Sequence, residues 1–251
     1  MSEKIKIRKE LDQKFINVDP LKDSYRESII EHPDHTKSIK QKNIALLCID
    51  MQYLDAAEGH GVFKDVLSSG ISPESQEYYF RTLKEIVFPN VRKLQDAFRS
   101  HNLEVIHIRI QSLTQDGRDR SNGHKYLGLL ASPGSKEAEF IEEVAPQGDE
   151  IIINKTSSGV FTSSNLFYVL KNLEIDSLWV TGVYTEECVS TTVRDANDLG
   201  FFVTLIEDGC TSVTPERHDF TIATLKDRYT RILTVEQAVN ELAETVPSNN
   251  K

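Results

Sequence analysis

Residues 177–196 read SLWVTGVYTEECVSTTVRDA, and this stretch decides the fold. Its first seven residues form a nearly continuous apolar run, which is typical of a buried strand in a parallel sheet. The residues from Cys188 onward are typical of a helix, and a short polar turn separates the two. A strand followed at once by a helix predicts one unit of an α/β fold, with Cys188 at the carboxyl edge of the sheet.

Cys188 has two interpretations at this position. Backbone N–H groups and the dipole at the start of a helix favour the thiolate, and nearby N–H groups could hold an oxyanion, so the residue is a candidate nucleophile. The alternative is a small buried hydrophobic residue, the usual role of an intracellular cysteine. Position alone does not separate the two, and the other strand ends are needed.

From Ile44 onward the chain alternates apolar strand-like runs with amphipathic helical runs, the pattern of a parallel sheet covered by helices. We therefore expect a three-layer α/β/α fold with a six-stranded parallel sheet in the order 3-2-1-4-5-6. The expected strands are residues 44–50, 104–110, 150–154, 178–183, 202–207 and 230–233. The expected helices are residues 75–101, with a kink or a break at Pro89, and residues 163–172, 187–199, 215–226 and 235–244.

The chain divides into an arm and a domain. Residues 1–43 are polar and mixed in charge with scattered apolar residues, so we expect an N-terminal arm that packs on the domain or on a neighbouring subunit; a disordered tail is the alternative. Residues 44–246 are expected to form a single domain. The loop at residues 111–135 is long and polar, and loops of that length usually have a function.

Charge and composition argue against several classes of partner. The 251 residues carry a formal net charge of -10, which disfavours nucleic acid and anionic membranes. No apolar run approaches the roughly 18 residues of a membrane span, and the N-terminus lacks the apolar core of a signal peptide. The 3 cysteines are too few and too widely spaced for a disulfide framework. We expect a cytoplasmic protein with reduced thiols.

Three reactive side chains fall at strand ends. Asp50 closes the first predicted strand, Lys155 follows the third, and Cys188 follows the fourth. In the order 3-2-1-4-5-6 the first and fourth strands are neighbours, which brings Asp50 and Cys188 together. A carboxylate there could take the thiol proton, and an ammonium could stabilise the negative charge. Alone, Asp50 could be a cap and Lys155 a solvated lysine, but the three strand ends together favour a reactive site.

Three motifs resemble the isochorismatase-like cysteine hydrolases, and within them the branch of ureidoacrylate, biuret and N-carbamoyl amidohydrolases. The first motif is DMQ at residues 50–52, and the second is Lys155 leading to SGVF at residues 158–161. The third is GVYTEECV at residues 182–189, followed by RDA at residues 194–196. The resemblance covers roughly four fifths of the chain, and its third motif is the most specific.

The resemblance implies the strand order given above and a catalytic triad of Asp50, Lys155 and Cys188. It also implies a cis peptide bond between Val183 and Tyr184, which would turn the Tyr184 N–H toward the Cys188 N–H to form an oxyanion hole. The implied reaction is hydrolysis of a small-molecule amide through a thioester. The implied enzyme is a homo-oligomer, a dimer or a tetramer, that uses no cofactor.

The loop after the second strand bears on which amide is cleaved. Nicotinamidases of this family hold a metal there with an Asp-x-His pair and a second histidine, but residues 111–124 read QSLTQDGRDRSNGH. Because His124 has no partner at ligand spacing, we expect no metal, and a nicotinamidase-like amidase is only an alternative. Arg109, Arg118 and Arg120 could bind a carboxylate or a urea-like group, or they could pair with the aspartates of the loop. We therefore expect a ureido, carbamoyl or biuret-like substrate.

The other candidates for the pocket wall are Gln52, Tyr53, Phe161 and Tyr184, with packing as the alternative for each aromatic ring. Two other functions compete. A dinucleotide-binding oxidoreductase needs a G-x-G-x-x-G turn after the first strand, and MQYLD at residues 51–55 contains no glycine, so we reject it. A non-catalytic family member that acts as a binding or scaffold protein is the other alternative, and the intact triad argues against it.

Overall fold

The computed structural model describes residue 25, residues 32–65 and residues 70–246. Six parallel strands form one sheet in the order β3-β2-β1-β4-β5-β6, which confirms the predicted topology. The strands are β1 (Ile44–Ile49), β2 (Glu104–Ile110), β3 (Ile151–Lys155), β4 (Ser177–Gly182), β5 (Phe202–Cys210) and β6 (Arg231–Leu233). Most of the expected N-terminal arm lies outside the described residues.

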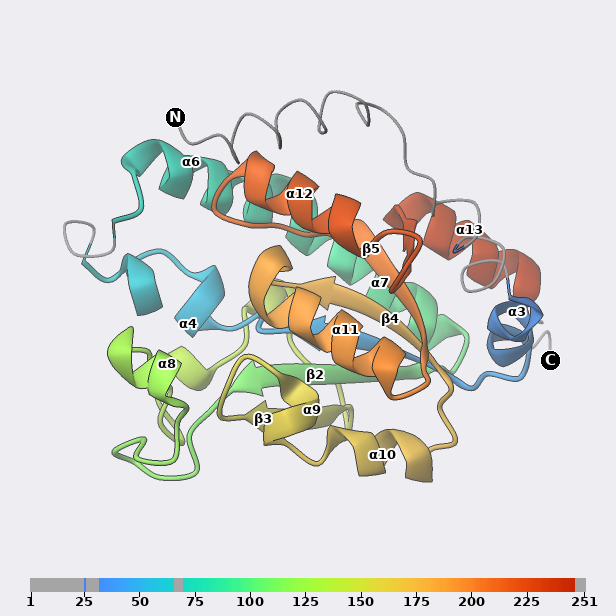
Figure 1. The fold of residues 1–251 in the computed structure, drawn as a ribbon, viewed down its shortest axis with the longest axis horizontal. Helices are drawn as coiled ribbons and strands as arrows, with labels where there is room; N and C mark the ends of the chain where they lie inside the picture. Colours follow the sequence, from blue (N-terminus) through green and yellow to red (C-terminus); the bar gives the residue numbers. More distant parts are fainter. Residues whose placement is uncertain (1–24, 26–31, 66–69, 247–251) are drawn as a thin grey trace, which may run out of the picture.

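Helices cover both faces of this sheet, as Figure 1 shows. The α-helices are α3 (Pro33–Lys40), α4 (Tyr53–Ala56), α6 (Pro73–Thr82), α7 (Phe88–Ser100), α8 (Asn122–Tyr126), α9 (Val160–Ser163), α10 (Leu166–Asn172), α11 (Ser190–Asp198), α12 (Pro215–Leu225) and α13 (Val235–Thr245). The shorter helical turns are η3 (Gly61–Phe63), η4 (Leu83–Val87), η5 (Lys136–Ala138), η6 (Glu142–Val144) and η7 (Thr185–Val189). No helix in the described part of the chain is both long enough and apolar enough to cross a membrane.

The strands alternate their side chains between two hydrophobic cores. On β1, Leu46 and Cys48 pack into the core under α3, α6, α7 and α13. Their neighbours Leu47 and Ile49 pack into the core under α9, α10, α11 and α12. Because both faces of the strand are buried, β1 is apolar throughout rather than alternating with polar residues.

Two predicted helices are interrupted, each for a local reason. The helix expected at residues 75–101 is divided by the π-helical turn η4, and Pro89 is the second residue of α7, directly after it. In place of the expected kink or break, the chain stays helical and the α-helical hydrogen bonding gives way to one π-helical turn before Pro89, because proline has no N–H to donate to the preceding turn. The helix expected at residues 163–172 is divided at Ser164, whose hydroxyl accepts a hydrogen bond from the Leu166 N–H at 3.1 Å and so starts α10.

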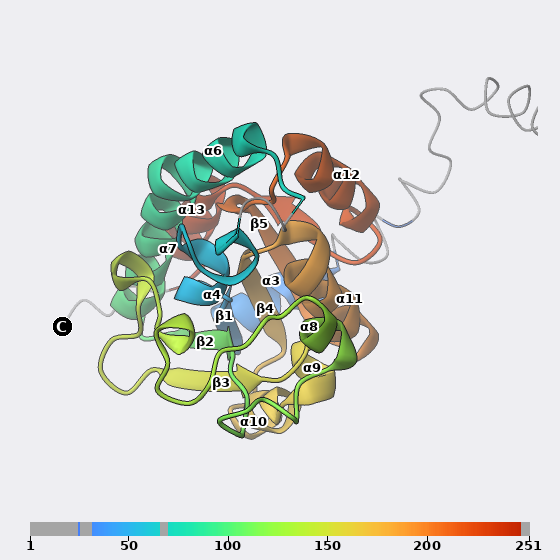
Figure 2. The ribbon, with the colours of Figure 1, turned by 90° about the vertical axis from the view of Figure 1, so that its left-hand side faces the viewer.

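The carboxyl ends of the strands meet at one end of the molecule, which Figure 2 views directly. The short helices α4 and α8 lie over these strand ends in that view. Neither helix was predicted, because each spans only four or five residues and lacks a recognisable apolar period. They close off the edge where the reactive side chains were expected.

Candidate active site

Asp50 is the first residue after β1 and is fully buried. Its φ angle is 54°, in the left-handed region that few residues other than glycine and asparagine or aspartate tolerate. Its N–H donates to the carbonyl of Ile108 on β2 at 2.9 Å, so the neighbouring strand holds this turn in place. Such a conformation costs free energy and is typical of functional positions.

Lys155 is the last residue of β3 and is also fully buried. Strand β2 lies between β3 and β1, and neighbouring strands are about 4.8 Å apart, so only a long side chain can reach across. The Lys155 Nζ lies 2.9 Å from Asp50 Oδ2, 3.2 Å from Cys188 Sγ and 3.1 Å from the Ser157 carbonyl oxygen. These three contacts account for the three N–H donors of the ammonium.

Cys188 lies in η7, between β4 and α11, and only 4% of its surface is exposed. The Thr192 hydroxyl donates to the Cys188 carbonyl oxygen at 2.7 Å and fixes the start of α11 to this turn. The peptide bond between Val183 and Tyr184 is cis, as the resemblance implies. The Tyr184 N–H has no hydrogen-bond acceptor among the described residues.

Burial sets the charge states of these three side chains. It raises the pKa of the Cys188 thiol well above the ordinary value, and the attraction of Lys155 opposes this only in part. Burial would lower the pKa of Lys155, but the charges of Asp50 and Cys188 outweigh it and raise that pKa. Burial also raises the pKa of Asp50, against the attraction of Lys155. Burial therefore favours the neutral thiol of Cys188, beside the 2.9 Å contact between Lys155 Nζ and Asp50 Oδ2.

This charge state differs from the thiolate expected at a helix start. Cys188 lies in the π-helical turn η7, which runs directly into α11, so it is in the first turn of a helix as predicted, but its side chain is buried there. Burial of the sulfur disfavours the thiolate, and it is the largest cause of the raised pKa of this thiol. The thiol needs a base at the moment of attack.

A cavity of about 300 Å³ lies over Cys188, a volume within the range of small-molecule sites. Among the candidates for the pocket wall, the structure brings Tyr184 to this cavity. Its other polar walls were not among the predicted wall residues; they are Asp55, His124, Glu186, Glu187 and Arg217. For the two glutamates a signal existed, since they directly precede Cys188 in the sequence.

Gln52 is not among the residues that line this cavity. Its side-chain amide bonds the main chain instead, donating to the carbonyl oxygens of Ile110 at 2.9 Å and Glu137 at 2.8 Å. Its Oε1 accepts the Ile110 N–H at 2.6 Å. Gln52 therefore braces the start of α4 against the end of β2.

Two of the predicted aromatic wall residues also lie elsewhere. The Tyr53 ring packs under the ammonium of Lys136, whose Nζ is 3.8 Å from the ring centroid. The Phe161 ring stacks on Phe201 with centroids 5.9 Å apart. Both rings contribute to packing, the alternative that the sequence left open.

The three arginines are engaged by the protein itself. Arg118 pairs with Asp116 at 3.1 Å on the surface. Arg120 donates to the carbonyl oxygens of Gly117 at 2.9 Å and of Leu129. Arg109 donates to the Asn154 side chain and to the Ala138 carbonyl oxygen, both at 2.8 Å, beside the ring of Phe140. None of the three lines the cavity over Cys188, and the contacts favour bracing of the loop.

The histidines near this site do not belong to a cluster of potential metal ligands among the described residues. His107 is fully buried and its Nε2 lies 2.9 Å from Glu150 Oε2, as expected for a core histidine. Within the described ranges, no three His, Cys, Asp or Glu side chains are grouped so that they could share a metal ion.

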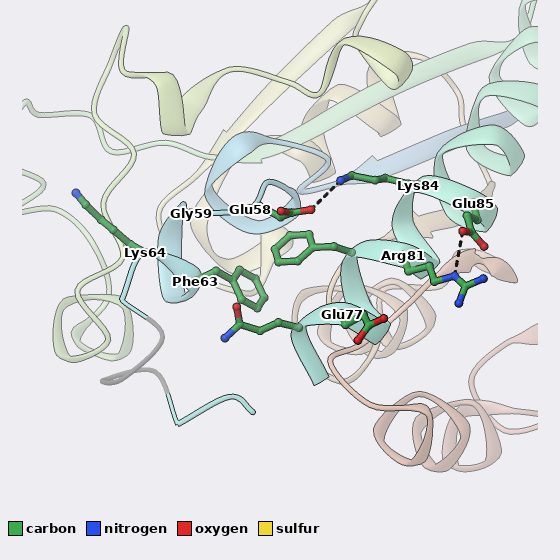
Figure 3. A pocket seen from close by; sticks show the side chains of 10 residues that line it. Glu58, Gly59, Phe63, Lys64, Glu77, Arg81, Lys84 and Glu85 are labelled. Carbon is green, nitrogen blue, oxygen red and sulfur yellow. Dashed lines mark hydrogen bonds and ion pairs between the residues drawn. The ribbon is translucent and has the colours of Figure 1, made fainter. Parts of the chain in front are cut away.

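A larger hollow of about 690 Å³ lies between the α4–η3 segment and α6, as Figure 3 shows. Its walls carry paired charges, with Lys84 Nζ 2.7 Å from Glu58 and Arg81 Nε 3.0 Å from Glu85. None of Asp50, Lys155 and Cys188 lines it. The larger hollow is therefore a charged surface depression, and the smaller cavity is the one that Cys188 lines.

Comparison with known proteins identifies relatives of this chain. An uncharacterized isochorismatase family protein, YrdC of Bacillus subtilis (strain 168), is 30% identical over 167 residues, which are 62% of this chain and 83% of that protein. The ureidoacrylate amidohydrolase RutB of Agrobacterium fabrum is 25% identical over 201 residues, 71% of this chain and 80% of RutB. The solved structure of an isochorismatase-like hydrolase from Alkaliphilus metalliredigens has a TM-score of 0.60 and 26% identity, and the match covers 78% of this chain and 97% of that one.

The family model of the isochorismatase domain matches residues 44–237, about the range predicted for the single domain. This match spans far more than half of the chain and confirms the resemblance carried by the three motifs. The chain belongs to the isochorismatase family of hydrolases.

Proposed function

We propose that this protein is a cysteine amidohydrolase that cleaves a C–N bond of a small ureido, carbamoyl or biuret-like compound. One observation carries the proposal: a single buried ammonium, that of Lys155, contacts both the Asp50 carboxylate and the sulfur of Cys188, the residue that lines the cavity. The name of the relative RutB, a ureidoacrylate amidohydrolase, supports the same bond type.

In the proposed first step, Asp50 takes the proton of the Cys188 thiol while the sulfur attacks the carbonyl carbon. Lys155 stabilises the negative charge on the sulfur as it forms. The N–H groups of Tyr184 and Cys188 receive the oxyanion of the tetrahedral intermediate. Asp50 then gives its proton to the leaving nitrogen, the C–N bond breaks, and a thioester on Cys188 remains.

In the second step, water replaces the amine. Asp50, again a carboxylate, accepts a proton from the water as its oxygen attacks the thioester carbonyl. Collapse of the second tetrahedral intermediate breaks the C–S bond, and the sulfur recovers the proton from Asp50. The acid product leaves and the neutral thiol beside the ion pair is restored.

The test is ammonia release from a panel of ureido acids, biuret, carbamoyl amino acids, simple amides and nicotinamide. Wild type is expected to release ammonia from at least one compound, and Cys188→Ala from none. Trapping of a covalent acyl adduct on Cys188, detected by mass spectrometry after rapid acid quench, would identify the thioester. Turnover that survives in Cys188→Ala would refute the proposed nucleophile, and wild type inert toward the whole panel would favour the non-catalytic alternative.

A further inference from the structure

Asp55 is a buried carboxylic acid that the proposed mechanism does not use. It lies in α4, only 4% of its surface is exposed, and it lines the same cavity as Cys188. Its Oδ2 is buried and has no hydrogen-bond partner among the described residues. Because nearly all buried polar atoms in folded proteins are paired, an unpaired carboxyl oxygen at a cavity wall indicates a missing ligand.

Two tyrosines fix Asp55 without satisfying its carboxyl group. The Tyr79 hydroxyl donates to the Asp55 main-chain carbonyl oxygen at 2.8 Å, and the Tyr184 hydroxyl reaches the same oxygen at 3.3 Å. A phenol has only one proton to donate: the Tyr79 hydroxyl gives its proton to this main-chain oxygen, and the Tyr184 proton is shared between this oxygen and the Tyr79 hydroxyl. The carboxyl group is held at the wall of the cavity by its backbone, and its Oδ2 is left available.

The wall of the cavity carries the carboxyl groups of Asp55, Glu186 and Glu187 but only one guanidinium, that of Arg217. The ammonium of Lys155 is already shared by Asp50, Cys188 and a carbonyl oxygen. The guanidinium of Arg217 is 3.3 Å from Glu186. Neither cation is left for Asp55.

A buried carboxyl group without a cation keeps its proton more tightly. Burial, and next the negative charge of Asp50, raise the pKa of Asp55 well above its ordinary value. A positive charge placed beside Asp55 would reverse this effect and complete the pairing that buried charges require.

We propose that Asp55 is a specificity-determining residue that binds a positively charged nitrogen, such as an ammonium group, at the end of the substrate remote from the cleaved C–N bond. This inference rests on the proposed function, because it assigns the other end of the same substrate. Asp55, Glu186 and Glu187 all line the cavity, so a substrate with a carboxylate at that end is disfavoured. The preferred substrate class is an amide or ureide that carries an amino group.

Binding to the Cys188→Ala protein tests this without requiring turnover. The probes are two ammonium compounds, β-alaninamide and γ-aminobutyramide, their neutral isosteres butyramide and valeramide, and the anionic succinamate. Calorimetry is expected to show that at least one ammonium compound binds about tenfold or more tightly than its isostere, with succinamate weakest. Asp55→Asn in the same background is expected to bring the paired affinities within about twofold of each other.

The control is Asp96→Asn, which removes one carboxylate from the exposed surface of α7, where Asp96 pairs with Arg92 and Arg99. It makes the same Asp-to-Asn replacement away from the cavity and is expected to keep the preference. Asp55→Ser gives the same readout if the asparagine variant does not fold, as judged by circular dichroism.

Four results would overturn the inference: equal affinity for ammonium and neutral compounds, tighter binding of succinamate, no binding of any probe, or a preference that survives loss of Asp55. Different results would overturn the proposed function. If the ammonium preference is found but wild type hydrolyses none of the probes or the ureido panel, Asp55 keeps its assigned role and the hydrolytic proposal falls. If wild type hydrolyses amides and Asp55→Asn leaves their relative affinities unchanged, only the inference falls.

Discussion

Two charged regions of this protein use their side chains in opposite ways. At the carboxyl edge of the sheet, Asp50 and Lys155 come from different strands, are fully buried and meet at 2.9 Å. In the loop at residues 111–135, Asp116 and Arg118 are exposed and pair two residues apart. An ion pair in the interior interacts far more strongly than one in water, and removing one of its members leaves a stranded charge. The buried pair can therefore support chemistry, whereas the exposed pair shapes a surface loop.

The largest effect is expected at the buried edge, from Cys188→Ala. Loss of the nucleophile is expected to lower kcat by about 10³-fold or more, because the remaining groups can only position the substrate and water. Initial rates of ammonia release, with the best substrate of the panel, measure this.

Cys48→Ala is the matched control, since Cys48 is also a buried thiol, lies in the neighbouring core and accepts a hydrogen bond from Gln95 Nε2 at 3.4 Å. It is expected to lower stability by about 1 kcal/mol and to keep kcat within about twofold. Equal losses of kcat in both variants would mean that packing, and not the identity of Cys188, sets the activity.

Breaking the buried pair is expected to cost stability as well as activity. Lys155→Met removes the partner of Asp50 and leaves its carboxylate buried and unpaired, which is expected to lower the free energy of unfolding by about 3 kcal/mol at neutral pH. Without its cation, the folded-state pKa of Asp50 rises further above the unfolded value, so the protonated folded form is favoured at low pH and the variant loses stability as pH rises.

Urea denaturation across a pH series measures both effects. The double variant Asp50→Asn, Lys155→Met is expected to be more stable than Lys155→Met alone, since no charge is stranded. A double variant less stable than either single one would contradict the role of the ion pair.

The buried edge was also the part of the site that the sequence could predict. Strand ends are readable from apolar periodicity, and a parallel sheet brings Asp50, Lys155 and Cys188 to one edge, whatever the details of the loops. Gln52 shows the limit of this reasoning. It lies in a motif beside Asp50, yet hydrogen bonds to the distant main chain of Ile110 hold it away from the cavity, and no local pattern reports such contacts.

Asp55 is the converse case, because it lines the cavity although no sequence pattern indicated it. It lies in a four-residue helix that the sequence did not reveal, and its importance depends on burial and on the pairing of Lys155 and Arg217 with other carboxylates. Both are tertiary properties. The arginines of the loop attracted attention because charge is visible in a sequence, whereas the partners that already neutralise it are not.

His124 belongs to the loop but is buried against the active-site cavity, so it lies between the two regions. Burial, with the positive charges of Lys155 and Arg120, lowers its pKa from 6.5 to about 4. Between these values the unfolded chain binds more protons than the folded one, so stability is lost as pH falls through this window. The loss is expected to reach roughly 2–3 kcal/mol near pH 4.

His124→Gln cannot take up this proton and is expected to have a flatter stability profile between pH 6.5 and pH 4. Thermal or urea unfolding of both proteins over this range gives the difference. Parallel profiles would show that His124 titrates normally, and hence that it is exposed to solvent with the rest of the loop.

The smallest effect is expected from Arg118→Ala, in the exposed pair itself. Its guanidinium contacts only the Asp116 carboxylate among the described side chains, and both groups are exposed, so stability is expected to change by less than about 0.5 kcal/mol and kcat/KM by less than about twofold. Arg120→Ala is the matched comparison, because Arg120 bonds the main chain at Gly117 and Leu129 and is expected to cost about 1–2 kcal/mol. A tenfold rise in KM for Arg118→Ala, with stability unchanged, would place substrate at the loop after all. In that case Arg118 of the exposed loop would bind the substrate together with residues at the buried edge.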